Sequence, residues 1–525
     1  MQSQREPFTF RLDRKVNSMS SVARSVQLLG GDACLVDIEC HMSAGLPAIL
    51  VVGMTSKSID ESKERLRAAF SSSGLTFPKK KITINLAPAD IQKLGSSFDL
   101  AIAVSILLGM GAVQKSKEQD SLYFGELGLD GAVRPVRGIV GRLLFSRKQG
   151  YKTVFVPKEN YEQALLVPQI TVIPVGSLTE IYEHLTEVKL IKSTETLGGI
   201  YNKPTKSELN DIIDFDEVIG QERAKRALLV AAAGGHNVLF NGPPGMGKSM
   251  LAKTLPGILP ALTHEEALHI THIHSLGNQD THKTVHTRPF RSPHHSASDV
   301  SIVGGGQNPR PGEITMAHGG VLFLDELPEF RRSSIESLRQ PLEDGVITVA
   351  RAKETATYPA QFMLVATRNP CPCGYFGSSH ECTCTAAQIF GYNKKISGPI
   401  EDRIDIHVTV DPVDHKDLLK VNTANTSQKL RIIVEQVRKT QSDRYGSSIT
   451  TNATASSKQI KQKINLTPEA KNLLNTAAQR LDLSPRVYMK TLKIAQTIAD
   501  LSNSNKVDVE HISEALQYRP IKTLL

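Results

Sequence analysis

Short apolar runs alternate with stretches of helical spacing along the first 190 residues. The runs at 48–52 and 81–86 have the length of strands, whereas 59–72 and 98–108 space their apolar residues as helices do. This alternation predicts one α/β domain over residues 19–190. The longest apolar stretch begins at 98 and is shorter than the roughly 20 residues that a membrane span needs, so we expect a buried core helix there.

The spacing of apolar residues and the local composition divide the rest of the chain into further segments. Residues 1–18 precede the first pattern, and the family resemblance given below implies that they are an N-terminal extension or a mis-chosen start. Residues 191–210 are polar, contain Gly-Gly and Pro, and lack a hydrophobic period, which is typical of a linker. Residues 211–412 alternate again as a second α/β domain. Residues 413–525 predict a C-terminal helical domain, and its Ser/Thr/Lys-rich stretch 447–465 predicts a mobile insert.

Composition narrows the class of protein. A chain of 525 residues with 40% hydrophobic and 22% charged residues is globular, and collagen-like or wholly disordered classes are excluded. Six cysteines and a polar N-terminus without an apolar signal core predict a reducing, cytoplasmic location and no membrane partner. The net charge of +9 permits a polyanionic partner. Since tryptophan is absent and aromatics are 5%, nucleic acid would be contacted mainly through its backbone.

The strongest motif is G-x-x-x-x-G-K-[ST], which follows the strand-like run 237–240 and opens a helix. In this motif backbone N–H groups wrap phosphates, Lys248 reaches the outer phosphates of ATP and the Ser249 hydroxyl ligates Mg²⁺. A glycine-rich turn that binds nothing is the alternative. The predicted nucleotide-binding residues are Gly242, Pro243, Pro244, Gly245, Met246, Gly247, Lys248, Ser249 and Met250.

A second strand-like run, 321–324, ends in two carboxylates. Beside the glycine-rich loop, Asp325 would hold Mg²⁺ and Glu326 would polarise the water that attacks the terminal phosphate. Taken alone, the same run is equally typical of a strand that meets an ordinary acidic turn.

Four of the six cysteines occur as two close pairs, Cys371, Cys373, Cys382 and Cys384. In a reducing cell such pairs favour a structural Zn²⁺ site. The C-x-C spacing is tighter than usual, and a redox switch or four incidental thiols are the alternatives.

Nine of the 16 histidines lie between His264 and His318. Acidic and cysteine ligands do not recur there at metal spacing, and the resemblance to AAA+ ATPases described below implies an insertion that faces the pore. We therefore interpret these histidines as polar loop residues that contact DNA phosphates, rather than as a metal cluster. Asp344-Gly345 followed by an apolar run predicts a basic hairpin. An exposed hairpin with solvated charges is the alternative. The predicted DNA-binding residues are Arg288, Arg291, Arg310, Arg351 and Lys353.

These motifs resemble the AAA+ ATPases of the magnesium-chelatase-like group. The segment 218–222, with Ile219, resembles the segment that brackets adenine, and Asn369 resembles the residue that senses the γ-phosphate. Arg403 in 397–406 resembles the arginine finger, for which a surface salt bridge is the alternative, and Arg486 resembles the second sensor. The resemblance implies a homo-hexameric ring in which a neighbouring subunit supplies the finger.

Three further segments, 85–90, 290–295 and 312–330, resemble the ComM/YifB family of bacterial proteins from residue 19 almost to the C-terminus. The family resemblance implies an ATP-driven DNA helicase that promotes branch migration during recombination of incoming single-stranded DNA in natural transformation. Recombinase or loading proteins would be its other partners. The alternatives are an ATP-driven chaperone subunit of a magnesium-chelatase-like complex, and a Lon-like protease or unfoldase.

The N-terminal domain resembles a Lon-type protease fold, which uses a Ser–Lys dyad. Ser97 matches the serine of that motif, but Val140 stands where the lysine would be. A serine without its base is a weak nucleophile. We therefore expect this Lon-like domain to be catalytically inactive.

Overall fold

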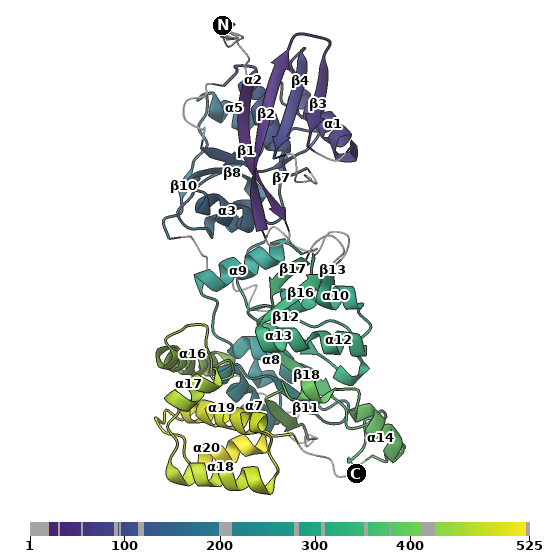
Figure 1. Ribbon diagram of the computed structural model, residues 1–525, viewed down its shortest axis with the longest axis vertical. Coiled ribbons are helices and arrows are strands. Elements are labelled where there is room, and N and C mark those ends of the chain that lie inside the picture. The colour runs from purple at the N-terminus through teal and green to yellow at the C-terminus, as the bar shows by residue number, and fades with distance from the viewer. Residues whose placement is uncertain are drawn as a thin grey trace, which may run out of the picture. The chain divides into compact units, whose positions relative to one another are not determined.

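The computed structural model describes residues 20–29, 32–53, 56–88, 93, 96–113, 120–198, 213–277, 283–305, 310–350, 355–377, 380–411 and 426–520. The chain forms two compact units, residues 1–200 and 201–525 (Figure 1). The extension 1–18, most of the linker 191–210, and both Arg351 and Lys353 lie outside the described residues.

The first unit is built on an eight-stranded mixed sheet in the order β10-β9-β8-β5-β1-β2-β4-β3. β1 and β2 are antiparallel, whereas β5, β8 and β9 are parallel neighbours. Its strands are β1 Ser20–Leu29, β2 Asp32–Ser43, β3 Ala48–Val52, β4 Lys81–Ala87, β5 Ser121–Tyr123, β8 Thr153–Pro157, β9 Thr171–Val175 and β10 Thr194–Glu195, with a separate pair β6 Glu126–Leu127 and β7 Val133–Arg134. Its helices are α1 Ser56–Ser72, α2 Asp99–Gly109, α3 Ile139–Lys148, η1 Lys158–Asn160, α4 Tyr161–Leu165 and α5 Leu178–Leu185.

The buried core helix predicted from residue 98 is confirmed as α2. All but one of its eleven residues are buried, including Asp99 at its first position. Arg65 donates a hydrogen bond to this carboxylate at 2.8 Å and the Ser62 hydroxyl donates one at 2.9 Å. The single charge in the apolar stretch is therefore paired inside the unit.

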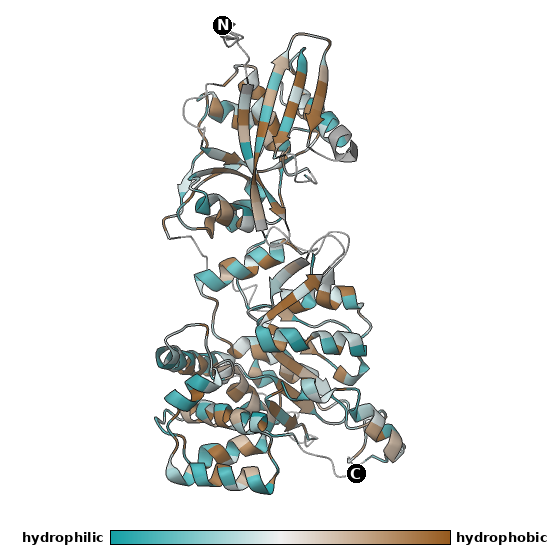
Figure 2. Cartoon of the chain, in the orientation of Figure 1, coloured by the Kyte–Doolittle hydropathy of each residue, from teal (hydrophilic) through white to brown (hydrophobic). Residues whose placement is uncertain are grey.

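The second unit is built on a five-stranded sheet in the order β12-β15-β18-β11-β19, and all neighbouring strands are parallel. The central strands are continuous apolar runs because both faces of a parallel sheet are covered (Figure 2). Its strands are β11 Val238–Asn241, β12 Phe290–Arg291, β15 Val321–Leu324, β18 Met363–Arg368 and β19 Ile406–Thr409, with two hairpins, β13 Gly304–Gly305 with β14 Arg310–Pro311 and β16 Val346–Ala350 with β17 Thr355–Pro359.

The C-terminal helices pack on this sheet unit through a shared core. Leu228 of α7, Phe240 of β11, Leu474 of α18 and Ile512 of α20 belong to one buried cluster. The helices of the unit are η2 Phe215–Glu217, α7 Glu222–Gly234, α8 Lys248–Ile258, α9 His264–Ser275, α10 Asp299–Val303, α11 Glu313–Met316, η3 Leu327–Glu329, α12 Arg332–Ser337, α13 Arg339–Asp344, α14 Ala386–Asn393, α15 Gly398–Glu401, α16 Thr426–Tyr445, α17 Ser457–Lys463, α18 Pro468–Arg480, α19 Pro485–Leu501 and α20 Val509–Gln517. This α/β unit with a helical C-terminal part fits the AAA+ fold of the magnesium-chelatase-like group.

Two local expectations are wrong. The stretch 447–465 is not a mobile insert, because it contains α17 and places Asn452 fully inside the protein, where its side-chain amide donates to Asp500 at 2.9 Å. The predicted hairpin exists as β16 and β17, but Asp344-Gly345 is not its turn. Gly345 instead ends α13 with φ of 69°, a left-handed cap that glycine adopts without strain.

No helix among the described ranges is both long and apolar enough to cross a lipid bilayer.

We predict that Asp500→Ala lowers the free energy of unfolding of the second unit by about 3–5 kcal/mol, measured by urea titration followed by circular dichroism. Asp500 accepts bonds from Arg444 at 2.8 Å, Asn452 and Gln496, and its side chain is 1% exposed. Its loss leaves a guanidinium and two amides unsatisfied. Glu222→Ala is the control, because the Glu222 side chain is 86% exposed, and a change below about 1 kcal/mol is expected. Equal effects would contradict the prediction.

Candidate functional site

The glycine-rich loop lies between the end of β11 and the start of α8. Gly245 and Gly247 both have φ of 78°, the left-handed region that favours glycine, and a Cβ at either would meet no atom within 4 Å. A Cβ at Gly242 would lie 2.6 Å from the Val410 carbonyl oxygen. The N-terminus of α8 has no side-chain cap, so its backbone N–H groups can bind an anion. The loop therefore has the form of a phosphate cradle.

Lys248 is folded onto this loop. Its ammonium donates to the carbonyl of Gly242, to that of Pro243 at 3.1 Å, and to the Asn369 side-chain oxygen at 2.8 Å. Burial lowers the pKa of Lys248 from 10.5 to about 8, against the opposing pull of Asp325 and Glu326. An anion at the loop would favour the charged lysine.

The carboxylate predicted to hold Mg²⁺ is positioned by two hydroxyls. Ser249 donates to one Asp325 oxygen at 2.7 Å and Thr367 donates to the other at 2.6 Å. The backbone N–H of Glu326 donates to the Thr367 hydroxyl at 2.8 Å. A hydroxyl and a carboxylate in contact form an oxygen donor set that suits Mg²⁺ with its waters.

Glu326 follows directly and occupies strained backbone, with φ of 54°. The Asn369 amide donates to its carboxylate at 3.3 Å, so Asn369 bridges Lys248 and Glu326. Glu326 and Asn369 line a cavity of about 540 Å³ together with Pro372 and Tyr392. The arrangement places a carboxylate where a water could be activated beside bound phosphate.

Sequence reasoning missed two residues of this site. Thr367 holds Asp325 and Glu326 as described, and a signal existed, because Thr367 stands two residues before Asn369, which is the side-chain period of a strand. The Gln221 amide donates to the Asp411 carbonyl at 2.6 Å and the Met246 carbonyl at 3.5 Å. This bond ties the segment containing the half-buried Ile219 to the loop. No pattern in the sequence indicated it.

The two predicted arginines of the ATPase cycle are both paired in the chain. Arg403 donates to the Pro399 carbonyl at 2.6 Å and to Glu343, and its side chain is 9% exposed. Arg486 donates to Asp402 at 3.2 Å and is half exposed. Their roles as finger and second sensor remain predictions.

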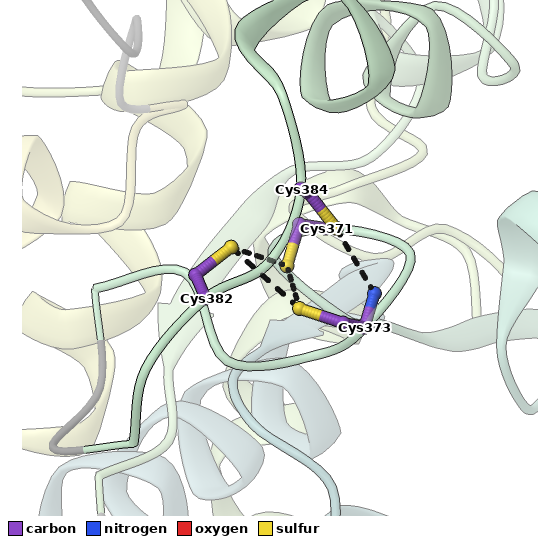
Figure 3. A group of neighbouring side chains, drawn as sticks. All are labelled: Cys371, Cys373, Cys382 and Cys384. Carbon is purple, nitrogen blue, oxygen red and sulfur yellow. Dashed lines mark hydrogen bonds between the residues drawn. The ribbon is translucent and has the colours of Figure 1, made fainter.

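The four cysteines of the two pairs converge, although they span residues 371–384. Figure 3 shows their sulfurs pointing toward one centre, and all four lie within 4.8 Å of one another. The Cys371 sulfur is 3.3 Å from that of Cys373 and 3.7 Å from that of Cys382, and Cys373 is 3.6 Å from Cys382. Tetrahedral Zn²⁺ with bonds of about 2.3 Å separates its sulfurs by about 3.8 Å, whereas a disulfide needs about 2.05 Å. The donor set fits a metal ion.

The histidine-rich region differs from the loop that we expected. Four of its histidines lie on α9, and burial lowers the pKa of His272 to about 4, so it is neutral. Arg288 donates to the Pro260 carbonyl at 2.6 Å and to Glu266 at 3.0 Å. Arg291 forms a two-fold ion pair with Glu313 at 2.6 and 2.7 Å. These contacts give both arginines a structural role, whereas Arg310 is exposed on β14.

In the first unit, Ser97 faces a cation rather than a base. Arg142 of α3 donates to the Ser97 hydroxyl at 3.4 Å, and burial lowers the pKa of Arg142 only to about 10, so it stays charged at neutral pH. Val140 is fully buried. Among the described residues, no lysine is hydrogen-bonded to Ser97.

Sequence profiles of three families match the chain. Magnesium chelatase subunit ChlI matches residues 214–418, the ChlI subunit of Mg-chelatase matches 38–160, and the ChlI C-terminal region matches 424–519. Competence protein ComM of Haemophilus influenzae is 39% identical over 95% of this chain and 97% of its own. The uncharacterized protein YifB of Escherichia coli is 39% identical over 96% and 98%. The magnesium-chelatase 67 kDa subunit of Chlorobaculum parvum is 30% identical over 30% of this chain and 24% of its own.

We predict that Thr367→Val lowers the rate constant of ATP hydrolysis about 10- to 100-fold, measured by phosphate release. The substitution keeps the volume of the side chain but leaves an Asp325 oxygen and the Glu326 N–H without their bonds. The control is Thr476→Val on α18, whose hydroxyl bonds only its own helix. A wild-type rate in Thr367→Val would contradict the prediction.

We also predict that nucleotide affinity falls as pH rises above about 8. Bound phosphates require the charged lysine, so above the pKa of free Lys248 binding takes up a proton, and the dissociation constant rises about tenfold per pH unit. Fluorescent ATP titrations between pH 7 and 9.5 measure this slope. Lys253→Gln, an exposed position on the same helix, should keep the same profile. A nucleotide affinity of the wild-type protein that stays constant up to pH 9.5 would contradict the prediction.

Proposed function

Because the chain belongs to the ComM/YifB family of magnesium-chelatase-like AAA+ proteins, we propose that it is an ATP-driven DNA helicase that promotes branch migration. The observation that carries the proposal is similarity to a competence protein over nearly the whole of both chains, combined with a complete nucleotide site. The proposed setting is recombination of incoming DNA during natural transformation. The proposed assembly is a homo-hexameric ring.

The nucleotide site supports ATP hydrolysis by this chain's own groups. Lys248 would release its loop carbonyls and bind the outer phosphates, while Ser249 and Asp325 would hold Mg²⁺, whose charge would neutralise that of the phosphates. Glu326 orients the attacking water and accepts its proton, and Asn369 keeps Glu326 beside the γ-phosphate. Arg403 of a neighbouring subunit would leave Glu343 and stabilise the transferring phosphoryl group.

DNA would be moved by basic elements of the second unit. Arg351 and Lys353 lie in the sequence between β16 and β17, outside the described residues, and Arg310 is exposed on β14. In a six-membered ring the excess of +9 per chain is repeated six times around a channel. Few aromatic residues are available for stacking, which favours tracking of the phosphate backbone with little sequence preference.

Two other functions use parts of the same chain. A magnesium-chelatase chaperone is favoured by the ChlI profiles, but the chelatase subunit of Chlorobaculum parvum is matched over only 24% of its length. A Lon-like protease is favoured by the proposed fold of the first unit. The contact of Ser97 with Arg142 supplies no general base, and this supports an inactive Lon-like module. We also propose that the four-cysteine site holds Zn²⁺.

We predict that forked or three-stranded DNA stimulates ATP hydrolysis and that the protein extends the joint in a three-strand junction assay. Lys248→Ala should abolish both activities, because the outer phosphates lose their cation. The mass of the particle in solution, measured with and without ATP and forked DNA, tests the proposed ring. We expect it to shift to the mass of six subunits.

Thr476→Val on α18 is the control and should keep both activities, since its hydroxyl bonds only its own helix. A rate of ATP hydrolysis that DNA does not change but a porphyrin-loaded partner protein increases would favour the chelatase function instead. ATP-dependent cleavage of casein that Ser97→Ala abolishes would favour the protease.

A further inference from the structure

The four-cysteine loop, residues 371–384, begins immediately beyond the nucleotide site. Asn369 directly follows β18, and Cys371 follows two residues later. At the other end, Cys384 is followed by Thr385, whose side chain caps α14. The loop therefore connects a residue of the ATP site to a helix, and its shape decides where that helix lies.

The loop touches the ATP site at two further points. A Cβ at Gly374 would lie 2.7 Å from the Pro244 ring, so the loop packs against the phosphate cradle. Pro372, between two of the thiols, lines the same cavity as Glu326 and Asn369. Of the two residues next to Cys373 in the chain, Gly374 therefore contacts the glycine-rich loop and Pro372 lines the cavity beside Glu326.

Helix α14 returns to the same place. Tyr392 is 4% exposed and lines the same cavity as Asn369. Lys395 lies over the Tyr392 ring at 5.3 Å and pairs with Glu329 at 3.3 Å, beside Glu326. The segment from Asn369 to Lys395 therefore begins and ends at the cavity, and the four thiols lie between these two ends in the chain.

The loop buries few of its own side chains, although the rings of Tyr375 and His380 lie in contact at 5.2 Å. Among its described residues, only Cys371 and Gly374 are buried, so it has no apolar core of its own. The N–H groups of Phe376 and Cys373 donate to the sulfurs of Cys371 and Cys384 at 3.3 and 3.4 Å, as they would to metal-bound thiolates. Binding of an ion to four convergent thiolates would supply the missing stabilisation.

We propose that the metal ion held by Cys371, Cys373, Cys382 and Cys384 sets the ATPase rate by fixing Asn369 and the contact of Gly374 with Pro244. This inference rests on the proposed ATPase function. The cysteines are positioning residues, since none of them contacts the nucleotide cradle itself. Loss of the ion would leave Lys248 and Ser249 in place, so ATP would bind but hydrolyse slowly.

The first experiment removes the ion from the full chain. Cys382→Ser should lose the one Zn²⁺ per chain that wild type carries, measured by mass spectrometry of untagged protein. Its rate constant of hydrolysis should fall about 10- to 100-fold, as expected when reacting groups are displaced by about 1 Å, while its affinity for fluorescent ATP stays near that of wild type. Cys34→Ser, in the first unit, should change neither. If Cys382→Ser is unfolded, chelation of wild-type zinc followed by its readdition replaces it.

The second experiment keeps the ion and disturbs the contact. Gly374→Ala should retain Zn²⁺, but its rate constant of ATP hydrolysis should fall about tenfold, because the added Cβ would overlap the Pro244 ring. Gly377→Ala is the matched control in the same loop, since Gly377 has φ of 77° against 87° for Gly374 but would meet no atom within 4 Å. Equal rates in these two variants would overturn the proposal, as would a zinc-free variant that hydrolyses ATP like wild type, or a wild-type protein that binds no metal.

Hydrogen exchange separates this inference from the proposed function. Removal of zinc should increase exchange in α14 and at the end of β18 and leave the first unit unchanged. If wild type hydrolyses no ATP, the proposed function fails, and this exchange pattern still decides whether the metal positions the site. Unchanged exchange in α14 after complete zinc loss would overturn the inference.

Discussion

Parallel pairing of β18 with β11 on one side and β15 on the other is the constraint on which the nucleotide site depends. The register sets Asn241 opposite Arg368 and Leu324 opposite Ala366. The glycine-rich loop, the acidic pair and Asn369 therefore leave the sheet at one edge, although up to 127 residues of chain separate them. Carboxyl ends of parallel strands are where such sheets bind ligands, because loops there can converge on one crevice.

Hydrogen bonds within the site hold two of its residues in energetically unfavourable states. Glu326 has a strained backbone and Lys248 a desolvated ammonium, and each is supported by a neighbour on another strand. Such strain persists only when the surrounding structure determines it. The consequence is a carboxylate and a cation already directed at the place where phosphate would lie, with Thr367 and Asn369 as the supports.

Contacts between distant segments explain where local sequence patterns were insufficient. The stretch 447–465 is polar, and polar composition alone indicated mobility, yet Asn452 is buried because Asp500 and Thr497 on α19 satisfy its amide. DNA binding by Arg288 and Arg291 stays a prediction, and the structure adds that carboxylates from α9 and α11 pair with them. In each case the partner lies on a different element, and no local pattern identifies it.

The sequence by itself determined the elements and the chemistry of the strongest motifs. Apolar runs predicted β11 and β15, and the glycine spacing predicted the loop between β11 and α8, because both depend on neighbours in the chain. Only the tertiary structure decided which polar groups meet. Thr367 on Asp325, Arg142 on Ser97, and the four-cysteine loop against Pro244 are contacts between distant segments, and their distances depend on packing that spacing along one chain does not encode.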